Sequence, residues 1–231
     1  MIRVFLGYDQ NETVAYHVLA HSIMRHASVP VSITPLKLSQ LPLTRARTPT
    51  QSTEFSFSRF LVPWLCGYEG KAIFMDCDML CRADIAELWD TETHTVVAVV
   101  QHEYDPRPGR KFLNNVQTVY PKKNWSSVML FNNAKCRALT QQLVNTANGL
   151  YLHQFKWAET VGKLDHAWNH LVGEYAPNQD VKIAHFTLGG PWFPEYAHCE
   201  YAQDWRKEVE LMLHRKTIDE YPVQEQERNF A

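Results

Sequence analysis

Two aspartates separated by one residue are the most suggestive chemical feature of this chain. Asp76 and Asp78 follow the apolar run Ile73–Met75, which is typical of a buried strand. On a strand, residues i and i+2 point to the same face, so both carboxylates can converge while Cys77 points away. Crowded carboxylates repel, and a divalent cation is the usual partner that relieves the repulsion. The alternative is a pair of solvated carboxylates where a strand gives way to a turn.

The composition limits the class of protein to which this chain can belong. Its 231 residues are 45% hydrophobic and 21% charged, which is ordinary for a soluble globular domain with a sizeable core. A net charge of −2 gives no general attraction to nucleic acid or to an anionic membrane, so we expect no nucleic-acid partner. No run reaches the roughly 18 apolar residues of a membrane span. Residues 1–9 predict a first strand instead of a signal peptide.

The cysteines favour a reducing environment. Five are scattered along the chain, and Cys77 and Cys81 lack the second pair that a zinc site would need. Reduced thiols in a cytoplasmic protein are therefore the simplest expectation.

Patterns typical of strands and of helices alternate along the chain. We expect strands at 2–6, 31–38, 73–78, 96–100, 127–131 and 182–186, and helices at 12–26, 54–65, 83–89, 134–146, 165–171 and 203–214. This alternation predicts an α/β fold, with a mostly parallel central sheet flanked by helices in a single domain. The long irregular stretches 39–53 and 102–124 are candidate substrate-binding loops.

Polar residues gather where three of the predicted strands end. These clusters are Tyr8–Asn11, Asp76–Asp78 and the residues from His185 onward. Ligands of such sheets bind outside the carboxyl ends of the strands, so an open sheet can bring the three clusters to one crevice. Tyr8 and Asp9 have an alternative role, because an acidic residue before a helix is a normal cap.

The order of motifs resembles that of glycosyltransferases of the GT-A fold, in the family 8 group that includes glycogenin and bacterial lipopolysaccharide glycosyltransferases. The resemblance covers about the first 190 residues. It is carried in order by Gly7-Tyr8-Asp9, Phe57-Ser58-Arg59-Phe60, FMDCDMLCRADIAELW with its Asp-x-Asp motif, WSSVMLFN at Trp125–Asn132, Asp165-His166-Ala167-Trp168-Asn169 and His185-Phe186-Thr187 before a Pro-Trp pair. The resemblance implies a GT-A-like (Rossmann-like) sheet and transfer of a sugar from a nucleotide sugar.

The resemblance also implies a metal site. Asp76 and Asp78 would bind Mn²⁺ or Mg²⁺ with His185 as the third ligand, and the ion would bridge the diphosphate of a UDP-sugar. Carboxylate, imidazole and phosphate oxygen suit these ions better than they suit a soft metal. The alternative for His185 is an ordinary core or surface histidine at the end of a strand.

Further roles follow from the resemblance alone. The donor-binding group would comprise Gly7, Tyr8, Asp9, Arg59, Asp76, Cys77, Gly189 and Gly190. Arg59 would contact the donor or orient Asp76. Asp165 and His166 would form the catalytic group, with Asp165 nearest the reacting carbon, and the anomeric configuration would be retained.

Two departures from the family pattern leave details open. The family lysine before Pro-Trp is replaced by Gly190, so the β-phosphate would be bound by backbone N–H groups of Gly189 and Gly190, or by Lys163 or Lys182. Trp125-Ser126-Ser127 replaces an Asn-Ser-Gly sequence that contacts the donor sugar, and the identity of that sugar stays open.

Three functions are compatible with these motifs. The first is a metal-dependent, hexosyltransferase-like glycosyltransferase. The second is a sugar nucleotidyltransferase, which would need a basic glycine-rich loop that Gly7–Gln10 does not provide. The third is a non-catalytic protein that binds a nucleotide sugar or a glycan.

The C-terminal part bears on the partners. We expect residues 1–200 to form the nucleotide-sugar-binding catalytic domain, and 201–231 to form a helix and tail packed on or beside it. The acceptor would be a glycan, a lipid-linked sugar or a small molecule. Residues 102–124 and 193–231 would shape its binding site. Acidic and basic residues alternate in 204–220, so contact with a membrane is the lesser alternative to packing on the domain. The sequence predicts no oligomeric state.

Overall fold

Two β-sheets that meet at the acidic motif form the framework of the fold. The computed structural model describes residues 1–46, 51, 53–103 and 121–214. The main sheet has the order β2-β1-β3-β6-β5-β7 and the small sheet the order β4-β9-β8. The strands of the main sheet are β1 (Ile2–Gly7), β2 (Val31–Leu36), β3 (Lys71–Met75), β5 (Val97–Val100), β6 (Val128–Asn132) and β7 (Val161–Leu164). Those of the small sheet are β4 (Met79–Cys81), β8 (His170–Leu171) and β9 (Ile183–His185).

The strand directions in the main sheet bring several polar segments to one edge. β1 pairs in parallel with β2 and β3, and β5 with β7, whereas β6 runs antiparallel to both β3 and β5. Met75 at the end of β3 therefore lies opposite Val128 at the start of β6. The predicted mostly parallel sheet is confirmed, and its carboxyl edge also carries the residues that precede β6.

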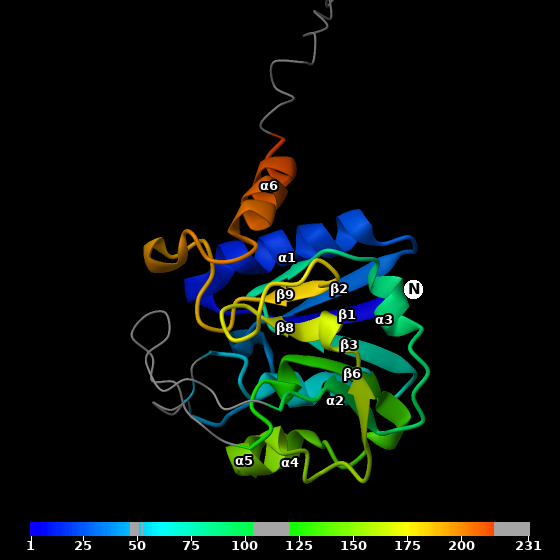
Figure 1. Cartoon of the computed structure of the whole chain (residues 1–231). Helices are drawn as coiled ribbons and strands as arrows, with labels where there is room; N and C mark the ends of the chain where they lie inside the picture. Colours follow the sequence, from blue (N-terminus) through cyan, green and yellow to red (C-terminus); the bar gives the residue numbers. More distant parts are fainter. Residues whose placement is uncertain (47–50, 52, 104–120, 215–231) are drawn as a thin grey trace, which may run out of the picture.

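Helices cover the main sheet on both sides. They are α1 (Thr13–His26), α2 (Val62–Leu65), α3 (Ile85–Trp89), α4 (Gln141–Thr146), α5 (Gly149–His153) and α6 (Ala202–Met212). In Figure 1, α1 lies above the sheet, and α2, α4 and α5 lie below it. Between these layers Phe74 and Phe131 are fully buried, and burial of each such side chain contributes about 2 kcal/mol to stability. The packed core fixes the strand ends from which the polar segments project.

A second apolar cluster holds the C-terminal helix against the domain. Val18 on α1, Leu80 on β4, Phe186 after β9 and Trp205 on α6 pack together. The predicted division of the chain into a catalytic domain at 1–200 and a C-terminal helix and tail at 201–231 stays a prediction. Within the described part of the chain, no helix combines the length and apolar character that crossing a bilayer requires.

Three predicted helices differ from the structure. Residues 54–65 form a 3-10 turn at Ser58–Leu61 and a single α-helical turn, α2, because Pro63 has no N–H and fits only the first turn of a helix. In 134–146 only α4 is α-helical, and it begins where the Thr140 side chain accepts the Leu143 N–H. In 165–171 a 3-10 turn leads into β8, because pairing with β9 overrides the local helical pattern.

Besides β8, three short elements were missed by the sequence reasoning. β4 and β7 have three and four residues, and α5 has five. Such lengths hold too few residues for a periodic pattern to be recognised. Of the predicted loops, 39–53 contains a 3-10 turn at Leu38–Gln40 and is otherwise without regular structure up to residue 46. Positions 47–50, 52 and 104–120 lie outside the described residues.

Candidate active site

The acidic motif crosses from the main sheet to the small sheet. Asp76 follows β3 and Asp78 precedes β4, with a bend at Cys77 and Asp78. The Asp76 N–H donates to the Ser127 carbonyl at 2.9 Å, and the Phe186 N–H donates to the Asp78 carbonyl at 2.8 Å. Convergence of the two carboxylates was predicted from alternation along one strand. It arises instead from this bend, which is anchored in both sheets.

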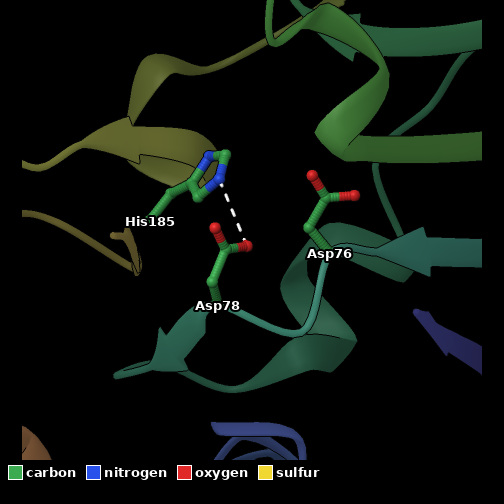
Figure 2. Close-up of side chains that lie close together, drawn as sticks. All are labelled: Asp76, Asp78 and His185. Carbon is green, nitrogen blue, oxygen red and sulfur yellow. Dashed lines mark ion pairs between the residues drawn. The ribbon is translucent and has the colours of Figure 1, made fainter. Parts of the chain in front are cut away.

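The two carboxylates meet an imidazole in a buried triad. One ligand atom from each of Asp76, Asp78 and His185 lies within 4.8 Å of the others. Figure 2 shows the three side chains converging, with His185 Nε2 at 3.4 Å from Asp78 Oδ1. Asp76 and Asp78 are 8% and 7% exposed, and His185 is 1% exposed. Two carboxylate groups and one imidazole in this geometry fit a divalent metal ion.

A buried asparagine sets the orientation of His185. Asn169 Oδ1 lies 2.8 Å from His185 Nδ1, and Asn169 Nδ2 donates to the Asn124 carbonyl at 3.0 Å. Because an amide oxygen only accepts, Nδ1 of a neutral His185 carries the proton. The lone pair is therefore on Nε2, the atom that faces Asp78. Sequence reasoning placed Asn169 in a family-like motif but did not assign it this role.

Arg59 forms a buried ion pair with Asp76. Its Nη1 lies 2.8 Å from Asp76 Oδ1 and donates to the Ser126 carbonyl at 3.0 Å. Of the two roles expected for Arg59, orientation of Asp76 is the one the contacts support. Burial raises the pKa of Asp76 to about 6, with Asp78 adding to the rise and Arg59 opposing it. Removal from water thus outweighs the attraction of Arg59 and disfavours the ionised form of Asp76.

A serine and a histidine behind Arg59 extend this network. Ser126 Oγ lies 2.8 Å from His153 Nδ1, and burial, with the nearby Arg59 charge, lowers the pKa of His153 to about 3. His153 therefore stays neutral and hydrogen-bonds Ser126 without adding charge beside Arg59. Sequence reasoning missed both residues, although the Trp125-Ser126-Ser127 segment marked the position of the serine.

Gly7, Tyr8 and Asp9, at the end of β1, were predicted to bind the donor. Gly7 and Asp9 make contacts that stabilise the fold. A Cβ on Gly7 would lie 2.5 Å from the Phe55 ring, so glycine is needed for that contact. Asp9 Oδ1 accepts the Asn11 N–H at 2.9 Å, and Oδ2 accepts the Glu54 N–H at 3.0 Å. Asp9 therefore caps the 3-10 turn Gln10–Glu12 that precedes α1, and not α1 itself, whose N-cap is Glu12. Tyr8 is partly exposed, and its contact with a nucleotide stays a prediction.

Cys77 and the two late glycines are also committed to packing. The Cys77 side chain is fully buried in the main core, and burial raises the pKa of its thiol well above the usual range. The predicted contact of Cys77 with a donor would therefore have to be made by its backbone. The Gly189 N–H donates to the Phe186 carbonyl at 2.8 Å, and Gly189 has φ 141° beside the Tyr196 ring. A phosphate-binding role remains predicted for the Gly190 N–H alone.

The predicted catalytic residues lie exposed after β7. Asp165 Oδ1 accepts the Ala167 N–H at 2.8 Å and so caps the 3-10 turn that His166 begins. Lys163 and His166 line a pocket of about 410 Å³. Of the two candidate phosphate lysines, Lys182 is paired with Glu87 at 2.6 Å, which leaves Lys163 as the better candidate. The catalytic roles stay predictions.

Comparison with known proteins identifies the class and the family. The chain matches the family described as Glycosyl transferase family 8 over residues 27–187. It is 45% identical over 222 residues to Protein CDI of Arabidopsis thaliana, an alignment that covers 90% of this chain and 86% of that protein. The chain is a glycosyltransferase, and it belongs to glycosyl transferase family 8. This membership decides against the nucleotidyltransferase and the non-catalytic binding protein.

Solved structures identify the fold. LgtC, solved with donor and acceptor sugar analogs, matches with a TM-score of 0.55 and 14% identity over 92% of this chain and 96% of that one. GlyE of Streptococcus pneumoniae matches with a TM-score of 0.61 and 15% identity over 97% and 66%. The bifunctional WbbM matches with a TM-score of 0.60 and 16% identity over 94% of this chain, which spans 52% of WbbM. The predicted GT-A fold is confirmed.

Proposed function

We propose that this glycosyltransferase uses a divalent metal ion, Mn²⁺ or Mg²⁺, and a nucleotide sugar, most simply a UDP-hexose. The observation that carries the proposal is the buried triad of Asp76, Asp78 and His185, whose ligand atoms lie within 4.8 Å of one another. Burial of two adjacent carboxylates is costly unless a cation compensates them. Sugar donors with a diphosphate need such a cation, because departure of the diphosphate builds negative charge.

The residues of the triad have distinct tasks in this proposal. When bound, the ion supplies Lewis-acid stabilisation of the leaving diphosphate. Asp76 and Asp78 hold it by carboxylate oxygens, and His185 offers the lone pair of Nε2. Asn169 keeps His185 in the required tautomer, and Arg59 fixes the orientation of Asp76.

The reacting centre is proposed beside Asp165 and His166, at the same edge of the main sheet. Both are exposed after β7, where an acceptor from solvent can reach them. In the retaining reaction that we propose, the bond between the anomeric carbon and the phosphate oxygen breaks, and Asp165 stabilises the positive charge that develops on the sugar. The acceptor oxygen forms the new bond to the same carbon on the same face, and its proton passes to the leaving phosphate. The cytoplasmic location expected from the free thiols stays a prediction.

Metal-dependent binding of UDP tests this proposal directly. Asp78→Asn removes one ligand charge and should weaken UDP binding in Mn²⁺ by about 100-fold or more, equivalent to about 2.7 kcal/mol. Asp180→Asn, at an exposed position in a loop, is the matched control and should bind as the wild type does. Titration calorimetry with and without Mn²⁺ measures both. Unchanged affinity and unchanged metal dependence in Asp78→Asn would falsify the metal assignment.

A further inference from the structure

A pocket shares a wall with the triad. It has a volume of about 410 Å³, and its lining includes Gln101, Glu103, Lys163, His166, His170 and Tyr175. The shared wall is the turn at His166–Asn169, because Asn169 contacts His185 while the residues at positions 166 and 170 line the pocket. The pocket therefore opens beside the proposed reacting centre, at the carboxyl ends of β5 and β7.

One side of this pocket is a fixed aromatic surface. The centroid of the Tyr175 ring lies 5.7 Å from that of His102, 5.9 Å from that of His170 and 6.3 Å from that of His166. The Tyr175 hydroxyl is hydrogen-bonded to His102 Nδ1 at 2.9 Å, and Trp125 Nε1 donates to the His102 carbonyl at 2.9 Å. These contacts hold the Tyr175 ring in place, and Tyr175 is part of the pocket lining.

Polar groups stand around that surface. His170 is 6% exposed, and its Nε2 has no hydrogen-bond partner among the residues that the structure describes. A buried polar atom without a partner is unfavourable, and a ligand hydroxyl that bonded it would relieve the cost. Gln101 adds an amide and Glu103 a carboxylate. Lys163 and Glu103 have opposite charges, so the described lining has no strong preference for an anion.

From this arrangement we infer that the pocket binds a neutral sugar ring of the acceptor. A pyranose has an apolar C–H face, which suits the Tyr175 ring, and hydroxyls at its rim, which suit His170 Nε2, Gln101 and Glu103. The volume is in the range of small-molecule sites. The inference rests on the proposed function, since it assigns the acceptor side of the same reaction, and it makes Tyr175 and His170 determinants of acceptor specificity.

Binding of simple glycosides in the presence of UDP and Mn²⁺ tests this inference. Ligand-observed NMR would compare neutral methyl glucoside, galactoside and mannoside with the corresponding sugar 6-phosphates. At least one neutral glycoside should bind more tightly than its phosphate. Tyr175→Ala and His170→Ala should each weaken that binding about tenfold, while the UDP affinity in Mn²⁺ stays unchanged. Tyr151→Ala, a partly buried tyrosine on α5 outside the described lining, is the control.

Two further variants keep the test decisive if an alanine variant fails to fold. Tyr175→Phe keeps the ring and should retain most of the glycoside affinity, and His170→Gln keeps a hydrogen-bonding group and should restore part of it. Binding of UDP with no glycoside binding, a preference for the phosphates, or variants without effect would overturn the inference and leave the proposed function intact. Absence of UDP binding in the wild type would overturn the proposed function and this inference with it.

Discussion

The protein buries acidic groups in two places, and it treats them in opposite ways. Glu208 on α6 is 3% exposed and receives Arg25 at 2.6 Å and His21 at 2.6 Å. Asp76 and Asp78 are nearly as buried. Arg59 pairs with Asp76, and His185 lies beside Asp78. Burial acts to raise the pKa of Glu208, yet hydrogen bonds from Arg25 and His21 bring it below its usual value. For Asp76, burial prevails and the pKa rises to about 6.

The difference separates a structural ion pair from the proposed metal site. At Glu208 both partners, Arg25 and His21, come from α1, so the interaction fastens α6 to the domain and is complete within the chain. At the triad, two carboxylates stand together and one of them is destabilised as an anion. Strong perturbation of this kind, in a cluster with metal-ligand geometry, is typical of functional sites. The missing compensation is what a divalent cation would supply.

The largest effect that can break this comparison is expected at Arg25. Arg25→Ala leaves the buried Glu208 carboxylate with His21 alone, and we expect the free energy of unfolding to fall by about 2 kcal/mol. That value is set below the usual cost of breaking a buried pair, because Arg25 is itself partly exposed. UDP affinity in Mn²⁺ should stay as in the wild type. Denaturant unfolding measures the first quantity and calorimetry the second.

The control is Lys207→Ala, which removes an exposed cation from α6, the helix that carries Glu208, and should change stability by less than about 0.5 kcal/mol. Equal losses in the two variants, or a loss of UDP affinity in Arg25→Ala, would show that the Glu208 interaction is not the self-contained structural contact described here.

A smaller effect is expected at Asn169, and it belongs to the functional side of the comparison. Asn169→Leu removes the acceptor that fixes the His185 tautomer, and metal-dependent UDP affinity should fall about tenfold, as it does when other residues that hydrogen-bond a metal ligand are replaced. Asn169→Asp keeps an acceptor for His185 Nδ1 and should retain more of the affinity than the leucine variant. The two titration curves in Mn²⁺ decide the matter, and coincident losses would remove the tautomer argument.

The sequence indicated the three residues of the triad more clearly than the residues that hold them in place. Asp76 and Asp78 were recognisable because they are neighbours after a strand, and His185 because family-like motifs surround it. The contact between Asn169 and His185 depends on β8 pairing with β9, and residues 165–171 have a helical pattern that hides that strand. Glu208 and Arg25 are 183 residues apart. Such contacts are set by packing of distant elements, which local periodicity does not encode.

The smallest expected effect is a difference in how the metal-free protein responds to pH. The folded-state pKa of Asp76, about 6, is above the value of about 3.9 for an unfolded chain. The folded state therefore binds more protons between these values, and stability should rise as pH falls from 7 to 5. The pKa of Glu208 shifts in the opposite direction. Its folded pKa is lowered, so its contribution is present above about pH 4.3 and is lost only at lower pH.

Asp78→Asn separates these two contributions. It removes the neighbouring charge that helps to raise the pKa of Asp76, so the rise in stability between pH 7 and 5, about 1 kcal/mol in the wild type, should shrink in the variant. The loss of stability below pH 4.3, which depends on Glu208, should be the same in both proteins.

Addition of Mn²⁺ should reverse the wild-type trend, because the ion binds the ionised carboxylates and stabilises the folded state more at pH 7. Melting temperatures from pH 7 to 3.5, with chelator and with Mn²⁺, provide the measurement. A flat profile with chelator would mean that the triad's own cations already compensate Asp76, which would make it a second structural ion pair like Glu208.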